Sequence, residues 1–254
     1  MPASFVLIHG GSTSHHYWDR LAPRLPGAVL APDTPGRLDR PADLMTLTVE
    51  DCVDSLLADI AAAELEHDLV LMVHSSGGLV APGLLRGLPA RVRHLVYSSA
   101  SVPAEGGCGL DCMRPRHADG IRAQFDWARE NGKSVTTLDG PAPDPEKART
   151  QYGGDPLDDE TLEFAMDPKR RVPDSFNVYF QTITWQGIDP ALPTTYLSNL
   201  RDRAVPLALQ REMLGRLPFA TRVIAIDGGH VPSVTAPDFV ATLLIGIAAE
   251  LANP

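Results

Sequence analysis

The sequence predicts an α/β fold in which a doubly wound, mostly parallel sheet carries helices on both faces. Three observations predict it. Short apolar runs alternate with helical patterns, polar residues of catalytic type follow the ends of several runs, and about 90 residues in the middle interrupt the alternation. Short apolar runs are typical of strands covered on both faces, and strands separated by helices pair in parallel with right-handed crossovers. The interruption predicts an inserted helical lid.

The apolar runs and the periodic segments give the expected elements in chain order. Strands are expected at residues 5–8, 29–31, 69–73, 95–97, 195–197 and 223–226. The clearest helix is expected from residue 49 to residue 63, because Cys52, Leu56 and Ile60 lie on one face and acids lie on the other. Residues 1–103 and 193–254 are therefore interpreted as the core, and residues 104–192 as the lid.

The lid is expected to contain helices at 119–130 and 158–166, joined by a proline-rich stretch at 140–145. It is also rich in aromatic side chains, which commonly line apolar ligand sites. Most of these side chains are expected to bury the lid against the core. Trp127, Tyr179 and Trp185 are the candidates for a substrate pocket.

A serine follows the buried run at 69–73 in the segment Val73-His74-Ser75-Ser76-Gly77. In a nucleophile elbow, G-x-S-x-G, such a serine lies on a strained turn between a strand and a helix, with its hydroxyl exposed. The next backbone N–H points at the developing oxyanion, which assigns that donor to Ser76. The first glycine of the pattern is replaced by Val73, a stiff and bulky residue. Either the following helix stands further off, for which a kink at Pro82 is one hypothesis, or catalysis is weakened.

The other parts of such a site occur in the required order. His9-Gly10-Gly11 follows the first run and predicts the second oxyanion donor, Gly11. Asp202 follows the fifth run, and His230 follows the sixth after two glycines. Serine, aspartate and histidine in this chain order are typical of the α/β-hydrolase triad. Ser75 is therefore the expected nucleophile, His230 its base and Asp202 the group that orients the base. Asp227 is the competing acid, but it belongs to the histidine's own loop.

These segments resemble the α/β-hydrolase superfamily, and within it the small methylesterase and hydroxynitrile lyase branch. The opening from Phe5 to Trp18, with the tryptophan nine residues after His9, is similar to that branch, as are the segments 193–206 and 210–213. The resemblance covers both ends of the chain, whereas the lid resembles the branch only in length and position. In hydroxynitrile lyases a threonine follows the first histidine and a lysine follows the catalytic one. Gly10 and Val231 stand there in this chain, which argues against cyanohydrin cleavage.

Composition and charge narrow the remaining classes of function. The 254 residues, 44% hydrophobic and 21% charged, suit one globular domain. A net charge of −10 argues against a nucleic-acid partner and an anionic membrane. The three cysteines lack disulfide or zinc spacing, and no signal or membrane-spanning segment is recognised, so a cytoplasmic location is expected. No metal-binding, phosphate-loop or dinucleotide motif occurs, so no metal and no cofactor are expected. A homodimer stays open.

The first expectation is a serine hydrolase that cleaves an ester, thioester or lactone of a medium-sized hydrophobic molecule through an acyl-enzyme. Gly10, His74 and Val231 complete the candidate pocket. The alternatives are a lyase or cyclase that uses the Ser–His pair as acid and base, and a ligand-binding relative without catalysis. Ser75 argues against an epoxide hydrolase or dehalogenase, which require aspartate at the elbow. A cofactor-free oxygenase or perhydrolase stays open.

Overall fold

A six-stranded, all-parallel sheet forms the centre of the computed structural model, which describes residues 3–65, 67–136 and 144–252. The strand order is β2-β1-β3-β4-β5-β6. The strands are β1 (Ser4–Ile8), β2 (Val29–Leu30), β3 (Leu69–His74), β4 (Val92–Ser98), β5 (Thr194–Asn199) and β6 (Thr221–Ile226). Five of the six predicted runs lie within these strands, and the run at 29–31 extends one residue beyond β2, so the predicted fold class is confirmed.

The register of the strands brings their carboxyl ends to one edge of the sheet. Val73 of β3 lies beside Ile8 of β1 and Tyr97 of β4. On the other side of β4, Asn199 of β5 pairs with Ile226 of β6. Because all strands are parallel, the loops that follow β1, β3, β5 and β6 leave from this edge and can meet there.

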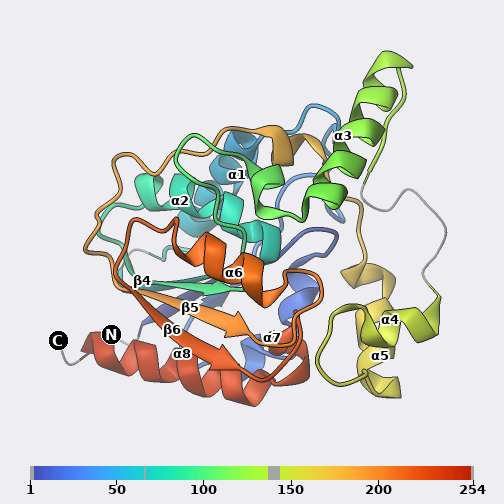
Figure 1. Ribbon diagram of the computed structural model, residues 1–254. Coiled ribbons are helices and arrows are strands. Elements are labelled where there is room, and N and C mark those ends of the chain that lie inside the picture. Colours follow the sequence, from blue (N-terminus) through green and yellow to red (C-terminus); the bar gives the residue numbers. More distant parts are fainter. Residues whose placement is uncertain (1–2, 66, 137–143, 253–254) are drawn as a thin grey trace.

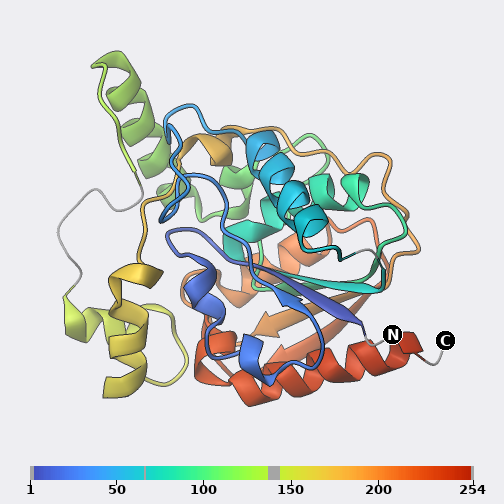
Figure 2. The ribbon, with the colours of Figure 1, turned by 180° about the vertical axis from the view of Figure 1, so that it is seen from behind.

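Helices cover both faces of the sheet, and side chains alternate between two apolar layers. Helix α8 (Pro237–Ala252) covers one face, and α1 (Val49–Ala62), α2 (Ala81–Gly87) and α6 (Leu207–Leu214) lie on the other (Figures 1 and 2). Along β3, Leu69, Leu71 and Val73 pack toward the α1–α2 layer, whereas Val70 and Met72 pack toward the α8 layer. This two-residue alternation is what a strand buried on both faces produces.

The insertion, residues 104–192, contributes no strand to the sheet within its described part. Its helices are α3 (Pro115–Glu130), α4 (Pro145–Gln151) and α5 (Asp159–Met166), with short 3-10 turns at Gly109–Cys112, Pro168–Arg170 and Asn177–Phe180. In Figure 1, α3 extends away from the sheet, and α4 and α5 form a separate pair beside the core. Apolar residues of α3, including Ile121 and Phe125, join the core layer that contains α1 and α2.

The predicted helices of the insertion need two corrections. The helix expected at 119–130 begins at Pro115, since proline favours the first turn, where its missing N–H costs nothing. Helix α4 was not predicted, because its seven residues are too short for an apolar period to be recognised. The expected helix at 158–166 is found as α5, with Asp158 as its N-cap. Residues 140–143 of the proline-rich stretch lie outside the described residues.

The segment after Ser75 also differs from the expectation of a kinked helix. A 3-10 turn, η3 (Ser75–Leu79), comes first, and α2 begins only at Ala81 with Pro82 in its first turn. Pro82 therefore kinks nothing, because an N–H is not needed at that position. Val73 is completely buried among apolar residues of the α1–α2 layer.

None of the helices in the described ranges is both long enough and apolar enough to cross a lipid bilayer.

Candidate active site

Ser75 occupies a strained turn at the carboxyl end of β3. Its φ is +51°, in the left-handed region that non-glycine residues rarely adopt, and its carbonyl accepts a hydrogen bond from the Ser101 N–H at 2.8 Å. The turn runs close to the loop after β1. A Cβ on Gly77 would lie 2.5 Å from the His9 carbonyl oxygen, so this position requires glycine. The local geometry is that of a nucleophile elbow.

His230 connects Ser75 to Asp202. Its Nε2 lies 3.0 Å from Ser75 Oγ, and its Nδ1 lies 2.7 Å from Asp202 Oδ2. His230 and Asp202 are each only 6% exposed, so water competes little for these hydrogen bonds. A serine, an imidazole and a carboxylate in this chain of contacts can activate the hydroxyl as a nucleophile.

Asp202, and not Asp227, lies against His230. The second carboxylate oxygen of Asp202 accepts hydrogen bonds from the backbone N–H groups of Ala204 and Val205, both at 2.8 Å. Asp227 is exposed and forms an ion pair with Arg201 at 2.7 Å. The turn after β5 therefore fixes one carboxylate oxygen and leaves the other for the histidine.

His74 contacts the loop of His230 and is absent from the lining of the cavity that contains Ser75. Its Nε2 lies 2.9 Å from the His230 carbonyl oxygen, and its ring stacks on Tyr17 with centroids 4.5 Å apart. Burial, together with the neighbouring His230, lowers the pKa of His74 well below its ordinary value. His74 is therefore neutral near pH 7, and Nε2 carries the proton that it donates to the His230 carbonyl.

The two expected oxyanion donors belong to residues that meet beside Ser75. Gly11 and Ser76 line the same cavity as Ser75. The Tyr179 hydroxyl hydrogen-bonds to Ser76 and Asp174, and a Cβ on Gly11 would lie 2.6 Å from that hydroxyl. Burial and the nearby Asp174 raise the pKa of Tyr179, so the phenol stays protonated and can donate to the carboxylate.

Asp174, a residue of the insertion, fixes the loop after β1. Its Oδ2 accepts the Ser12 N–H at 3.3 Å, and its Oδ1 lies 2.9 Å from Arg37 Nη2. Asp174 and Arg37 are almost fully buried, and Arg37 Nε donates to the Thr13 carbonyl at 2.7 Å. This ion pair was missed in the sequence, because no spacing or motif connects a loop arginine to an aspartate of the insertion.

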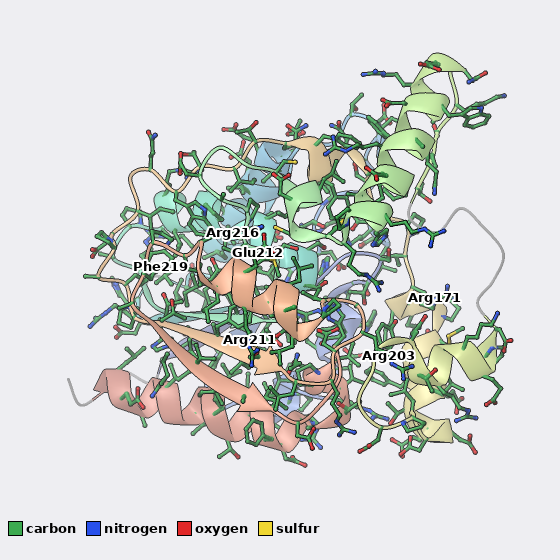
Figure 3. All side chains as sticks on the ribbon, viewed as in Figure 1. Arg171, Arg203, Arg211, Glu212, Arg216 and Phe219 are labelled. Carbon is green, nitrogen blue, oxygen red and sulfur yellow. The ribbon has the colours of Figure 1, made fainter. Side chains whose placement is uncertain are left out.

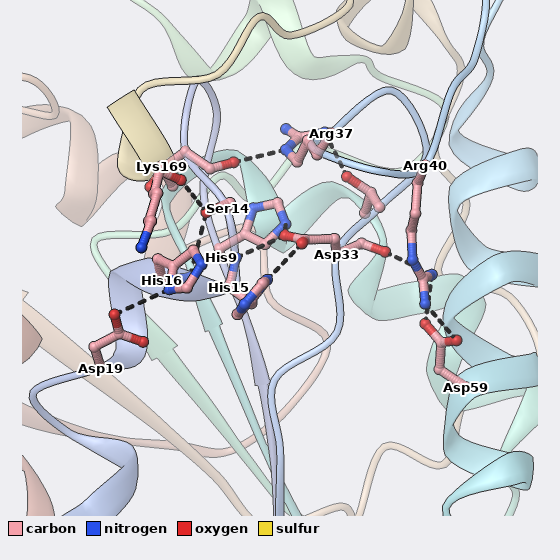
Figure 4. A network of polar contacts seen from close by, with 12 residues as sticks. His9, Ser14, His15, His16, Asp19, Asp33, Arg37, Arg40, Asp59 and Lys169 are labelled. Carbon is pink, nitrogen blue, oxygen red and sulfur yellow. Dashed lines mark hydrogen bonds and ion pairs between the residues drawn. The ribbon is translucent and has the colours of Figure 1, made fainter. Parts of the chain in front are cut away.

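A wider polar network surrounds the same loop (Figure 4). Asp33, which follows β2, accepts the His15 N–H at 2.6 Å and contacts His15 Nδ1 at 2.5 Å. His9 Nε2 lies 3.4 Å from Asp33, and burial lowers the pKa of His9 well below its ordinary value. His9 is therefore a neutral side chain that contacts the backbone of its own loop, with Nδ1 2.9 Å from the Gly10 carbonyl oxygen.

A second part of the insertion contacts the acid and base loops. The Tyr152 carbonyl accepts the His230 N–H at 2.8 Å, and Gly153 forms an isolated β-bridge with Asp202. The Gly154 N–H donates to the Arg201 carbonyl at 3.2 Å. Residues 152–154 therefore connect the loops that carry Asp202 and His230.

The cavity beside Ser75 has a volume of about 440 Å³, within the range of small-molecule sites. The nucleophile and the expected oxyanion residues form one side. Apolar and aromatic side chains, among them Ile121, Phe176 and Val205, form much of the rest. The full lining is Gly11, Ser12, Ser75, Ser76, Ser101, Cys112, Met113, Arg114, Arg116, His117, Gly120, Ile121, Gln124, Phe176, Tyr179, Ala204 and Val205.

Of the six pocket candidates, the structure places Tyr179 in this cavity and the other five elsewhere. Trp127 is 57% exposed on α3, and Trp185 is buried against Phe219 with its indole N–H on the Pro103 carbonyl. Val231 packs in the α8 layer. Gly10 lines a separate cavity of about 30 Å³ with His9 and Arg37, and His74 lies behind His230. Aromatic content alone does not tell which side of the insertion faces the nucleophile.

The described residues contain no group of three or more His, Cys, Asp or Glu side chains arranged to bind a metal ion.

The chain belongs to the alpha/beta hydrolase family, whose pattern it matches over residues 5–243. It is therefore an enzyme of the α/β-hydrolase fold, as the resemblance implied.

Similar proteins include a hydrolase and two esterases. A pyrethroid hydrolase from Sphingobium wenxiniae is 26% identical over 257 residues, covering 96% of this chain and 86% of the relative. A pimeloyl-[acyl-carrier protein] methyl ester esterase from Aromatoleum aromaticum is 28% identical over 264 residues, covering 94% and 95%. A carbendazim hydrolyzing esterase from a Nocardioides species is 33% identical over 128 residues, about half of each chain.

Solved structures share the fold over almost the whole chain. An extracellular alpha/beta-hydrolase from a Paenibacillus species superimposes with a TM-score of 0.78 at 23% identity, covering 96% of this chain and 98% of that one. Polyneuridine aldehyde esterase gives a TM-score of 0.69 at 19% identity, covering 98% and 100%. A methylesterase from Arabidopsis gives 0.70 at 15% identity, covering 97% and 99%.

Proposed function

We propose that this enzyme is a carboxylic-ester hydrolase in which Ser75 attacks the ester, His230 transfers the proton and Asp202 orients the histidine. The observation that carries the proposal is the continuous contact from Asp202 through His230 to Ser75 Oγ, where the nucleophile opens onto a cavity. The names of the similar proteins, one hydrolase and two esterases, support the same reaction class.

Acylation follows from the positions of these groups. His230 Nε2 accepts the Ser75 proton while Oγ bonds to the ester carbonyl carbon, and Asp202 stabilises the imidazolium. The imidazolium then protonates the leaving alcohol, and the acyl group stays on Ser75. Water, deprotonated by His230, attacks the acyl-enzyme, releases the acid and restores the serine.

Two backbone donors complete the proposed site. The N–H groups of Gly11 and Ser76 bind the oxyanion of each tetrahedral intermediate, an interaction whose loss typically costs about 10²–10³ in rate. The contacts of Asp174 with Ser12 and Tyr179 position the Gly11 side of this pair. Apolar side chains in the cavity favour a hydrophobic acyl or alcohol group, and its volume of about 440 Å³ limits the substrate to a small or medium-sized molecule.

Labelling with a fluorophosphonate probe tests the proposal. Intact-mass measurement is expected to show one adduct on the wild type and on Ser76→Ala, which keeps its backbone N–H, and none on Ser75→Ala. Hydrolysis of short p-nitrophenyl esters is expected to fall by about 10⁶ in Ser75→Ala.

An absence of adduct and of ester turnover in the folded wild type would contradict ester hydrolysis. Turnover without an adduct on Ser75 would contradict its role as nucleophile. The first result would favour a lyase or cyclase that uses the Ser–His pair as acid and base, and binding without turnover of any candidate substrate would favour a ligand-binding protein.

A further inference from the structure

The side of the cavity formed by the start of α3 carries positive charge. Arg114, Arg116 and His117 line it, together with Ser75 and the oxyanion residues. Although the chain has a net charge of −10, no aspartate or glutamate occurs among the described residues that line this cavity. Burial and Arg114 lower the pKa of His117, so the charge at this end comes from the two guanidinium groups. The lining of this cavity is therefore positively charged, although the protein as a whole is acidic.

Neither of the two arginines is engaged by an acidic side chain of the described residues, although Arg114 also borders a second cavity that Asp111 and Asp119 line. Within the described ranges no carboxylate forms an ion pair with Arg114 or Arg116, and the first turn of α3 contains no acid. By comparison, Arg216, which follows α6, pairs with Glu212 at 2.5 Å and also donates to the carbonyls of Val102 and Asp111 (Figure 3). The guanidinium groups at the cavity are therefore available to a ligand.

We propose that the ester cleaved by this enzyme carries an anionic group, which Arg114 and Arg116 bind while the ester carbonyl lies at Ser75. This inference rests on the proposed ester hydrolysis and adds the substrate class. A guanidinium group binds a carboxylate through paired N–H donors, and two of them in a cavity shared with the nucleophile fix the orientation of the substrate as well as its charge. The apolar walls between the two ends contact the carbon skeleton of the substrate.

Matched pairs of esters test the proposal, whichever part of the substrate bears the charge. Mono-p-nitrophenyl adipate and p-nitrophenyl hexanoate differ by a carboxylate in place of a methyl group on the acyl chain. Para-carboxyphenyl hexanoate and para-tolyl hexanoate make the same exchange on the leaving group. In at least one pair we expect the wild type to prefer the charged ester by about tenfold in kcat/KM, the size of a charge-assisted hydrogen bond. Ser75→Ala provides the blank for spontaneous hydrolysis.

Variants of the arginines test whether these residues cause the preference for the charged ester. Arg114→Gln/Arg116→Gln is expected to remove most of it, mainly by raising KM for the charged ester, because the contact is made equally in the ground state and the transition state. Arg116→Glu is expected to reverse it in favour of the neutral ester. Arg122→Gln is the matched control, since Arg122 lies on the same helix and is exposed but does not line the cavity. High salt, about 1 M, is expected to weaken the wild-type preference.

The outcomes separate the two proposals. Equal or better turnover of the neutral member in both pairs would overturn the anionic substrate and leave ester hydrolysis standing. A preference for charge that survives in the double glutamine variant would also overturn the assignment to these arginines. A folded wild type that hydrolyses none of the four esters and takes no fluorophosphonate label would overturn both.

Discussion

At the scale of single residues, each of the three groups in the proposed triad is fixed by a contact with the backbone. The Ser75 carbonyl accepts the Ser101 N–H, and one oxygen of Asp202 accepts two N–H groups from its own turn. His230 is held through its own backbone, because its carbonyl accepts from His74 and its N–H donates to the Tyr152 carbonyl. The side chains are therefore oriented before substrate binds, which reduces the reorganisation that catalysis requires.

Asp202 and Asp227 differ in their contacts, so substitution of each is expected to have a different effect on turnover. Asp202→Asn is expected to lower kcat for a p-nitrophenyl ester by about 10⁴, because an amide cannot stabilise the imidazolium or fix its tautomer. Asp227→Asn is the control, since that carboxylate contacts Arg201 at the surface. A larger loss of kcat in Asp227→Asn than in Asp202→Asn would show that the acid has been assigned to the wrong residue.

The sequence predicted the residues of the proposed triad better than the residues that support them. Ser75, Asp202 and His230 each follow a strand, so the parallel topology alone places them on one edge. The pair of Arg37 and Asp174 depends on how the insertion folds back over the loop after β1. No local propensity encodes that approach.

At the scale of elements, the insertion contacts both halves of the proposed catalytic machinery. Residues 152–154 contact the loops that carry Asp202 and His230, whereas Asp174 contacts the loop that carries Gly11. In the chain, residues 152–154 lie between α4 and α5, and Asp174 follows α5. Figure 3 shows Arg171 and Arg203 beside the pair of helices α4 and α5. A change in the insertion can therefore alter turnover without touching a reacting group.

Gly153 tests the contact with the acid and base loops. Its φ is +77°, and a Cβ there would lie 1.9 Å from the Arg201 carbonyl oxygen, so Gly153→Ala must move the strand-like contact with Asp202. We expect kcat to fall by about 10²-fold, the cost of a small misplacement in a catalytic site. Gly132→Ala is the control, because Gly132 also has positive φ but open space at its Cβ. Equal kcat in the two variants would contradict the coupling.

The buried ion pair tests the contact with the oxyanion loop. Arg37→Met leaves the Asp174 carboxylate buried without its cation, so the free energy of unfolding is expected to fall by about 3–5 kcal/mol. Under conditions where the variant is folded, kcat is expected to fall more than KM rises, because the oxyanion donors act in the transition state. Urea unfolding and steady-state kinetics measure the two effects.

Arg40→Met provides the comparison for that variant. Arg40 also forms an ion pair, with Asp59 at 2.7 Å, but this pair is more exposed and joins the loop after β2 to α1. We expect a smaller loss of stability and no change in kcat. If Arg37→Met behaved in the same way, the pair of Arg37 and Asp174 would be structural only.

Elements of the core were predictable because their signals are local. All six strands follow from short apolar runs, and α1 follows from its apolar face and the capping box at Thr48. The insertion was less predictable for two reasons. Helix α4 is short, and the orientation of the insertion's aromatic side chains is set by contacts with residues distant in sequence. Trp127 and Trp185 show this, since one is exposed and the other fills the core.

At the scale of the whole molecule, the surface and the cavity beside Ser75 differ in charge. Acidic residues that outnumber basic ones by ten lie mostly on the surface, whereas the cavity beside Ser75 is lined by arginines and no acids in its described part. Besides His230, three of the eight histidines, His9, His74 and His94, are buried in the loops and strands of the core. Burial is the main cause that lowers the pKa of each, and for His94 the pKa falls to about 4.

These histidines predict how the stability of the whole chain depends on pH. Because their folded-state pKa values lie below the unfolded-state value of about 6.5, the unfolded chain binds protons first as the pH falls. The stability present above pH about 6.5 is then lost on acidification, by up to about 1.4 kcal/mol per pH unit for each histidine. Urea unfolding between neutral pH and about 4.5 measures this slope.

A variant of His94 isolates one of these contributions and spares the proposed catalytic site. His94 contacts the Thr195 hydroxyl at 2.9 Å within the sheet, and glutamine can keep that hydrogen bond without titrating. His94→Gln is expected to reduce the pH dependence of the free energy of unfolding below pH about 6.5, by the contribution of about one titrating proton. The same pH dependence in the variant and the wild type would mean that His94 is protonated in the folded protein. A wild-type free energy of unfolding that did not change with pH in this range would contradict the burial of His9, His74 and His94 as neutral side chains.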